Sequence, residues 1–298
     1  MTSPCSIYHA ARMVRAALIK WNPGEMDNSE ATTMAGTPSA GVPRATPDKR
    51  RLTRWHASGV HLLISAAIAA AVLTLMLFVW YPPPLFEAAG GNDLALILIG
   101  VDVVIGPLLT WIIFKPGKWG LKFDLVAIAL FQVAALAYGS YIIYLARPAF
   151  VVFVKDRFEV VSAVELKPER LAAARFEEFR KPPLTGPMLV GGAWPTTRAE
   201  QQMLLDANLA GEDLHHFPKY YVPYADSRRE ILAKADPLAR VREVEPSAAK
   251  IIDEWLAGSG RSERDVLHLR LRARHAWVAV LIDRRTAQPV KMLVTEKL

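Results

Sequence analysis

The amino-acid sequence predicts a membrane protein in which three transmembrane α-helices precede a small α+β domain with a mostly antiparallel sheet. The first observation is a set of three apolar runs, each close to the ~20 residues that an α-helix needs to cross hydrocarbon. They lie at about 61–80, 94–114 and 125–145. The second observation is that most of the 298-residue chain outside these runs has the composition of a soluble protein. We therefore divide the chain into an N-terminal extension, a membrane-spanning domain and an α+β domain, at 1–48, 49–148 and 149–298.

Basic residues flank the apolar runs on alternate sides, and this third observation gives an orientation. The connection between the first two runs, 81–93, has no lysine or arginine and contains two acids. Cytoplasmic loops carry an excess of lysine and arginine, so the N-terminus and the second loop are predicted to be cytoplasmic. The α+β domain then lies on the far side, which is the periplasm if the membrane is the inner membrane of a Gram-negative bacterium. The residues that set this topology are Arg50, Arg51, Arg54, Lys115, Lys118 and Lys122.

The N-terminal extension is rich in Ala, Pro, Thr, Ser and Gly, and we expect it to be disordered. Met13, Met26 and Met34 are alternative starts within it. The net charge of +7 divides into +4 before residue 61, zero from 61 to 148 and +3 afterwards, so no part is basic enough to indicate nucleic-acid binding. The single cysteine, Cys5, excludes an internal disulfide.

The α+β domain shows helix and strand signals in order along the chain. Residues 150–161 are rich in β-branched and aromatic side chains, which predicts a strand that begins at the membrane surface. Thr197 and Glu200 have the spacing of a capping box, which predicts a helix over 197–208. The last stretch alternates apolar and polar residues and predicts a β-hairpin with a turn at 285–288. Further helices are expected at 168–179, from 226 or 227 to 234, and at 248–256.

Polar and small residues form a stripe inside the second apolar run. Asp102 lies about eight residues into the run, roughly 12 Å from its outer end, where an ionised carboxylate costs about 2.5–3.5 kcal/mol. Gly106 and Thr110 follow at four-residue intervals and share its helix face, and Pro107 is expected to kink the helix. The third run carries a comparable stripe that includes Gln132 and Gly139.

The sequence leaves three interpretations of these stripes open. In the first, the stripes pack the three helices against each other, with Asp102 hydrogen-bonded to Gln132 or to a hydroxyl group. In the second, part of this surface accepts the apolar helix of another membrane protein. The third is a proton or ion relay, for which one central carboxylate without a second is thin support.

The α+β domain shows no residue pattern for catalysis, metal binding or cofactor binding. His215 and His216 are adjacent, but no acid or cysteine follows at the spacing of a zinc site. The Gly-Ser-Gly at 258–260 lacks the pattern of a nucleophile elbow, and there is no phosphate loop or dinucleotide fingerprint. We predict that the protein is not an enzyme. Three alternating arginines form the solvated face of a strand or, alternatively, a docking surface for an acidic partner: Arg270, Arg272 and Arg274.

Four stretches of the sequence resemble the TfpX/TfpZ family of type IV pilin accessory proteins. They are RWHASGVHLLIS at 54–65, FVWYPPPLFEAAGG at 78–91, GVDVVIGPLLTWIIFKPGKWGLKFDL at 100–125 and YLARPAFVVFVKDRFEVV at 144–161. A looser likeness, VAVLIDRRTAQPVKMLV, lies near the C-terminus. The resemblance covers about Arg51 to the end and is densest through Val161. Members of this family are expected to begin close to the first apolar run, so the N-terminal extension is a departure that favours a later start.

The resemblance implies a chaperone-like helper in the inner membrane that supports the production, stability or assembly of a type IV pilin, and it supplies no catalytic residues. A pilin awaiting assembly is held in the membrane by a long apolar helix with its head in the periplasm. Our hypothesis is that the stripe of Asp102, Gly106 and Thr110 meets the pilin helix, while the domain after Phe150 contacts the head. The alternative is a membrane-bound sensor with a periplasmic ligand-binding domain. The sequence leaves the oligomeric state open.

Overall fold

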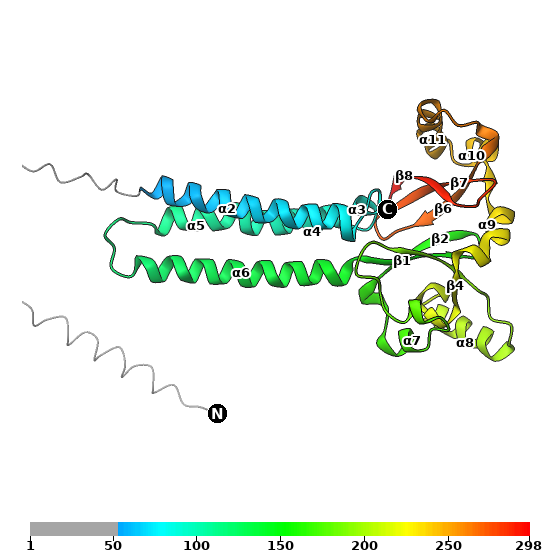
Figure 1. Cartoon of the computed structure of the whole chain (residues 1–298), viewed down its shortest axis with the longest axis horizontal. Helices are drawn as coiled ribbons and strands as arrows, with labels where there is room; N and C mark the ends of the chain where they lie inside the picture. The colour runs from blue at the N-terminus through cyan, green and yellow to red at the C-terminus, as the bar shows by residue number, and fades with distance from the viewer. Residues whose placement is uncertain (1–52) are drawn as a thin grey trace, which may run out of the picture. The chain divides into compact units, whose positions relative to one another are not determined.

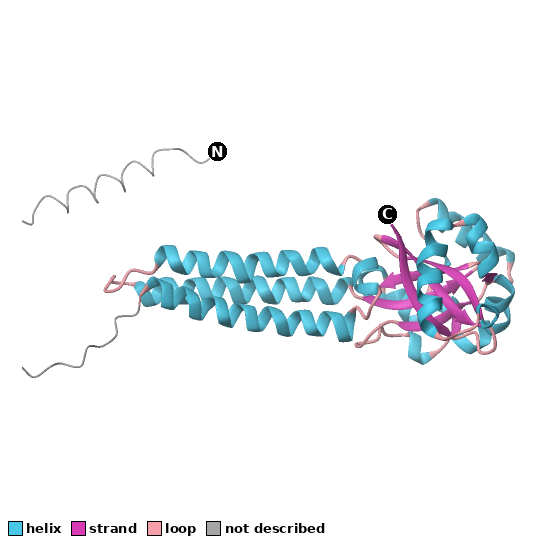
Figure 2. Cartoon of the chain, turned by 90° about the horizontal axis from the view of Figure 1, so that it is seen from above, coloured by secondary structure: helices cyan, strands magenta, loops and turns pink. Residues whose placement is uncertain are grey.

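The computed structural model describes residues 53–298, all of which fall in one compact unit of the chain. Three long helices lie side by side and lead into a sheet domain (Figure 1, Figure 2). The predictions for the extension 1–48 and for Arg50 and Arg51 fall outside the described residues.

Three helical stretches of the described chain are long and apolar enough to cross a membrane, which confirms the three predicted runs as helices. We call them the first, second and third apolar helix. The first and second each contain a π-helical segment, whereas the third is regular. The first consists of α2, Arg54–Leu75, and η1, Met76–Trp80; the second of α4, Gly91–Ile99, η2, Gly100–Ile105, and α5, Gly106–Ile113; the third is α6, Leu121–Ala146.

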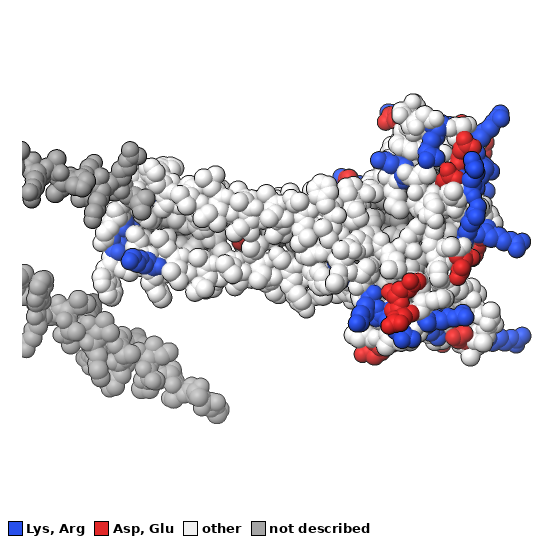
Figure 3. All heavy atoms as spheres, in the orientation of Figure 1, with Lys and Arg blue, Asp and Glu red and all other residues white. Residues whose placement is uncertain are grey.

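The second apolar helix contacts both of the others, α2 on one side and α6 on the other. The visible face of the three helices is almost free of charged atoms, and the charges gather on the sheet domain and at the opposite end of the helices (Figure 3). At that end the guanidinium carbon of Arg54 lies 5.7 Å from the ring centroid of Trp111. The described residues that were predicted to set the topology lie there: Arg54, Lys115, Lys118 and Lys122.

The connection between the first two apolar helices folds onto the sheet domain. It forms a short helix, α3, Leu85–Ala88, whose Leu85 and Ala88 side chains are buried in the core of that domain. The backbone N–H of His275 donates to the carbonyl of Ala88 at 2.9 Å, and the Lys297 ammonium lies 2.9 Å from the Glu87 carboxylate. The helices and the sheet are therefore joined by packed contacts as well as by the chain itself.

The sheet has eight strands, of which seven follow the order β4-β3-β1-β2-β6-β7-β8, and the short β5 also pairs with β6. The predicted C-terminal hairpin is confirmed as β7 and β8, which are antiparallel neighbours. The strands are β1, Pro148–Val154, β2, Arg157–Ser162, β3, Met188–Gly192, β4, Tyr221–Pro223, β5, Asp236–Pro237, β6, Val266–Arg272, β7, Ala276–Asp283, and β8, Pro289–Lys297.

The prediction of a mostly antiparallel sheet is wrong, because the sheet is mixed. At its centre β1 pairs in parallel with β3, and β2 pairs in parallel with β6. Parallel neighbours need a long crossover, and the connections from β1 to β3 and from β2 to β6 both carry helices. The alternation of apolar and polar residues identifies hairpin neighbours, but it does not reveal which strands meet across such connections.

The predicted single strand at 150–161 is a hairpin of two strands. β1 and β2 are antiparallel neighbours joined through Lys155 and Asp156. Lys155 has φ of 59°, the left-handed backbone that two-residue hairpin turns use. The apolar run continues across this turn, so the composition alone shows one strand where the chain folds back on itself.

Helices cover both faces of the sheet, which explains why every residue of β1 is buried. Val151 and Phe153 pack with α3 and α9 on one face, and Phe150 and Val152 pack with α7 and α8 on the other. A strand that is covered on both faces has a continuous apolar sequence. The helices are α7, Pro168–Ala172, α8, Arg198–Leu209, α9, Arg228–Lys234, α10, Leu238–Val244, and α11, Pro246–Ser259.

The predicted N-cap of α8 is confirmed, since Oγ1 of Thr197 accepts from the backbone N–H of Glu200 at 3.3 Å. The Glu200 side chain accepts from the Thr197 hydroxyl, so the capping box is not complete. The predicted helices at 226–234 and 248–256 correspond to α9 and α11. The helix expected at 168–179 is shorter, because α7 ends at Ala172. The strands β3, β4 and β5 and the helix α10 were not predicted.

The C-terminal end of α6 is capped by groups from elsewhere in the chain. The last four carbonyls of a helix have no partner within it. Here the hydroxyl of the fully buried Tyr81 donates to the carbonyl of Ile143 at 2.9 Å, and Nη1 of Arg147 donates to the carbonyl of Tyr144 at 2.6 Å. Nη2 of Arg147 donates to the carbonyl of Pro183 at 2.9 Å. The Tyr81 bond thus joins the first apolar helix to the third, and Arg147 ties the third to the sheet domain.

We expect Tyr81→Phe to lower the free energy of unfolding by about 1–3 kcal/mol, because the carbonyl of Ile143 then stays buried without its hydroxyl donor. Thermal unfolding of the detergent-solubilised protein, followed by near-UV circular dichroism, measures this loss. The matched control is Tyr138→Phe on α6, where the residue is 69% exposed and no change in Tm is expected. Equal Tm values for the two variants would contradict the capping role.

Candidate functional site

The break in the second apolar helix is centred on Pro107. A proline has no backbone N–H, so the helix before it loses a hydrogen bond. The preceding segment is the π-helical η2, in which Asp102 lies five positions before Pro107. The side-chain amide of Gln132 on α6 donates to the backbone carbonyl of Asp102 at 3.3 Å. A side chain thus replaces the bond that the nitrogen of Pro107 does not make, as a backbone group in apolar surroundings requires.

Two other residues of the stripe contact the neighbouring helices. Gly106 lies against Gln132, since a Cβ atom at position 106 would be 1.9 Å from Nε2 of Gln132. Thr110 is buried, and its Oγ1 shares a hydrogen bond of 2.6 Å with Nδ1 of His61 on α2. The stripe therefore lies inside the three-helix unit, where it holds α2 and α6 against the second apolar helix.

The side chain of Asp102 differs from that of Thr110 in the same stripe, because it has no hydrogen-bond partner among residues 53–298. The residue is 7% exposed, and its Oδ1 makes no hydrogen bond within 53–298. Oε1 of Gln132 is likewise buried and unpaired in this part of the chain. The hydrogen bond between the two residues uses the backbone carbonyl of Asp102, so a side-chain oxygen of each remains without a donor.

Two grooves beside α6 lead to Asp102. The first has a volume of about 130 Å³, lies between α2 and α6, and is also lined by Ser65, Gln132 and Val133. The second has a volume of about 310 Å³, lies between α4 and α6, and has mainly apolar walls with Gly139 among them. A role for these surfaces in binding a partner stays a prediction. Gly139 lies beside the second groove. The structure brings the other five predicted residues together: Asp102, Gly106, Pro107, Thr110 and Gln132.

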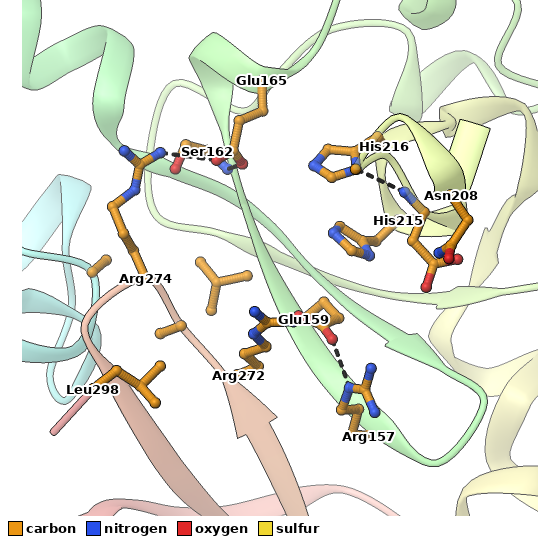
Figure 4. Close-up of a pocket in the computed structure, with 15 residues that line it drawn as sticks. Arg157, Glu159, Ser162, Glu165, Asn208, His215, His216, Arg272, Arg274 and Leu298 are labelled. Carbon is orange, nitrogen blue, oxygen red and sulfur yellow. Dashed lines mark hydrogen bonds and ion pairs between the residues drawn. The ribbon is translucent and has the colours of Figure 1, made fainter. Parts of the chain in front are cut away.

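A second group of polar residues lines a cleft of about 490 Å³ in the sheet domain (Figure 4). The cleft opens where β2 and β6 part, because these strands pair over only two residues each. The short 3₁₀ helix η5, Leu214–His216, contributes the facing wall. Figure 4 shows Arg272, Glu159 and His215 turned toward the same space.

Glu159 is the buried carboxylate of this cleft. Nε of Arg157 lies 2.6 Å from Oε1 of Glu159, yet burial raises the pKa of Glu159 above its usual value. Arg274 pairs with Glu165 at 2.9 Å. Arg272 forms no ion pair with any other residue of the described chain. The cleft therefore contains one guanidinium group, that of Arg272, which forms no ion pair with the acids that line the cleft.

The two adjacent histidines of η5 have ring centroids 4.1 Å apart. Nδ1 of His216 accepts a hydrogen bond from the backbone N–H of Asp213 at 3.2 Å, so a neutral ring carries its proton on Nε2. Burial, and then the charge of His216, lowers the pKa of His215 to about 3, which keeps this ring neutral at physiological pH. Among residues 53–298 no group of three potential ligands gathers to hold a metal ion.

Sequence reasoning did not find the cleft, because its walls come from β2, η5 and the end of β6, which are far apart in the chain. The three alternating arginines gave part of the signal. Arg272 and Arg274 line the cleft, whereas Arg270 stacks on Trp277, with its guanidinium carbon 4.1 Å from the ring centroid. Alternation along a strand shows that side chains share a face, but not what lies opposite them.

Comparison with known proteins finds fimbrial assembly proteins. The family model described as "Fimbrial assembly protein FimB" matches residues 49–90. The chain is 37% identical over 186 residues to the fimbrial assembly protein of serogroup I from Dichelobacter nodosus, a match that covers 61% of this chain and 72% of the relative. The serogroup E1 protein of that organism is 36% identical over 186 residues, which again cover 61% of this chain and 72% of the relative. The protein of serogroups C1 and C2 is 41% identical over 120 residues, 39% of this chain and 91% of the relative. No solved structure matches the chain.

We expect Gly106→Ala to lower the free energy of unfolding by about 1–3 kcal/mol, because the added methyl group displaces Gln132 and frees the carbonyl of Asp102. The matched control is Gly100→Ala, in the adjoining π-helical segment, where a Cβ atom has no neighbour within 4 Å. Thermal unfolding in detergent compares the two. If both variants keep the wild-type Tm, the contact between Gly106 and Gln132 is not required.

We expect Arg157→Ala to lower the free energy of unfolding by about 2 kcal/mol at neutral pH, because Glu159 is left buried without its partner. This loss is smaller than that for a fully buried ion pair, because the Arg157 side chain is 35% exposed. The pKa of Glu159 in the folded state is raised above 4.5, the pKa of the same side chain in the unfolded chain. Ionisation of Glu159 therefore destabilises the fold as the pH rises above 4.5. The loss should therefore shrink at about pH 4, where the carboxyl is neutral.

Thermal unfolding at about pH 4 and about pH 7.5 measures this dependence. The double variant Arg157→Ala with Glu159→Gln serves as the control, because it removes both charges and should recover stability at neutral pH. A loss that is the same at both pH values would show that Arg157 acts by packing alone.

Proposed function

Because the chain belongs to the family of fimbrial assembly proteins, we propose that it is an accessory protein of the inner membrane that supports the stability or assembly of a type IV pilin. The narrower assignment that we propose is the TfpX/TfpZ family. The protein would bind pilin through its transmembrane surface and its sheet domain. The observation that carries this proposal is the similarity to fimbrial assembly proteins across 72% of their length.

The architecture supports a two-part contact with pilin. A pilin that awaits assembly offers an apolar helix in the membrane and a globular head outside it. Here three apolar helices lead directly into a sheet domain, and α3 and Arg147 fasten the two together. A binding surface that includes both parts therefore keeps a fixed spacing, which suits a partner with the same division into helix and head.

The proposed orientation places the N-terminus in the cytoplasm and the sheet domain in the periplasm. The basic residues at the free end of the helices support it, because Lys115, Lys118 and Lys122 lie at the end that the positive-inside rule assigns to the cytoplasm. The proposed role is one of binding, without a catalytic residue, metal or cofactor.

The alternative is a membrane-bound sensor whose periplasmic domain binds a small ligand. The cleft of about 490 Å³ favours it, since pockets for small ligands have volumes of about 300–1,000 Å³. The same cleft also fits the pilin proposal as part of the surface that meets the pilin head.

Deletion of the gene tests the function. We expect lower levels of pilin or fewer surface pili, and a loss of twitching motility, because unassembled pilin would lack its membrane partner. Immunoblots of pilin, electron microscopy of pili and motility assays measure these effects, with the wild-type gene in trans as the control. Normal pilin levels, pili and motility in the deletion strain would favour the sensor.

A further inference from the structure

We infer that the groove between α2 and α6 receives the transmembrane helix of a partner, which places a hydrogen-bond donor side chain against the carboxyl group of Asp102. The inference rests on the proposed function, in which that partner is a pilin. It adds the position of the contact and the chemistry of the group that makes it.

The first step is that the described chain does not satisfy Asp102 itself. Its Oδ1 is buried without a hydrogen bond, and so is Oε1 of Gln132. A polar group in this environment costs several kcal/mol unless it is paired. Polar residues that remain in transmembrane helices in spite of this cost commonly mark functional sites.

The second step is that no described donor that lines this groove bonds to Oδ1 of Asp102. The Gln132 amide donates to the backbone carbonyl of Asp102. Nδ1 of His61 and Oγ1 of Thr110 share their own hydrogen bond. Each of these bonds also joins two helices, so diverting its donor to the carboxyl would loosen the three-helix unit. Residues 53–298 thus supply no donor to Oδ1 of Asp102, and in the proposed complex the partner helix supplies it.

The third step is that the groove suits a helix with a polar side chain better than it suits a lipid chain. Its walls combine Ile64, Ile68 and Val133 with the small residues Ser65 and Ala129, and small residues let a neighbouring backbone approach closely. Its volume of about 130 Å³ gives room for a side chain that reaches toward Asp102. A lipid tail would fill the space but would supply no donor.

The groove between α4 and α6 is the weaker candidate, although it is larger. Apart from Asp102 and the Tyr138 at its edge, its walls are apolar, so it offers a partner little to recognise. The groove between α2 and α6 is lined by both Asp102 and Gln132, each of which has an unpaired oxygen, along with Ser65 and His61. Two acceptors without donors match a partner side chain that carries an N–H or O–H group.

Photocrosslinking in cells that produce the full chain and its pilin tests the inference. A photoreactive residue replaces Val133, which lines the groove and is 64% exposed, or Phe131, which is 79% exposed on α6 but does not line it. We expect crosslinks to the membrane helix of pilin from position 133 and far fewer from position 131. Equal yields from both positions would overturn the inference while leaving pilin binding intact.

The chemistry is tested by Asp102→Leu, which should lower the crosslink yield from position 133 about tenfold, as loss of an interhelical hydrogen bond predicts. Asp124→Asn, which changes a carboxylate outside the groove, is the control and should leave the yield unchanged. The isolated Asp102→Leu protein should keep or exceed the wild-type Tm in detergent, because the lost carboxyl has no internal partner. A lower Tm would assign Asp102 a structural role and overturn the inference. Absence of pilin crosslinks at every position, with normal pili in the deletion strain, would instead overturn the proposed function.

Discussion

An unpaired backbone carbonyl is costly in an apolar environment, and Pro107 creates one in the middle of the second apolar helix. Much of the three-helix unit follows from the way this carbonyl is satisfied. The helix widens into a π-helical segment, and Gln132 crosses from α6 to donate to the carbonyl of Asp102. Gln132 can approach only because residue 106 has no Cβ atom. The amide of Gln132 thus donates to the backbone of Asp102, and Oδ1 of the Asp102 carboxyl group has no donor among the described residues.

The same need for partners at helix ends joins the apolar helices to the sheet domain. Tyr81 and Arg147 supply donors to the last carbonyls of α6, and Arg147 continues to the carbonyl of Pro183. The backbone N–H of Gly186 donates to the carbonyl of Val79 at 2.6 Å, at the end of the first apolar helix. These bonds and the burial of α3 make the junction a packed interface, so movement of a helix at this end has to move the sheet domain as well.

The sequence predicted the elements whose signals are local and missed those that depend on distant neighbours. Apolar length identified the three helices, and the Thr197 cap identified the start of α8. The stripe of Asp102, Gly106 and Thr110 was visible because residues four apart share a helix face. The hairpin at Lys155 was missed because its turn lies inside an apolar run and uses a lysine in a left-handed backbone. The parallel pairing and the cleft were missed because long connections bring their residues together.

Both halves of the molecule have a cavity that is lined by residues with unpaired polar groups. In the helices these are the oxygens of Asp102 and Gln132, and in the sheet domain the cleft holds Nδ1 of His215 and the guanidinium of Arg272. A folded chain usually satisfies its buried polar groups, so those that it leaves unpaired at a cavity mark places where a ligand can supply the missing bond. One cavity offers acceptors inside an apolar environment, and the other offers a cation beside water. This division matches a partner that has an apolar helix with a donor side chain and a soluble head with acidic groups. It therefore favours a binding protein that holds such a partner at both places.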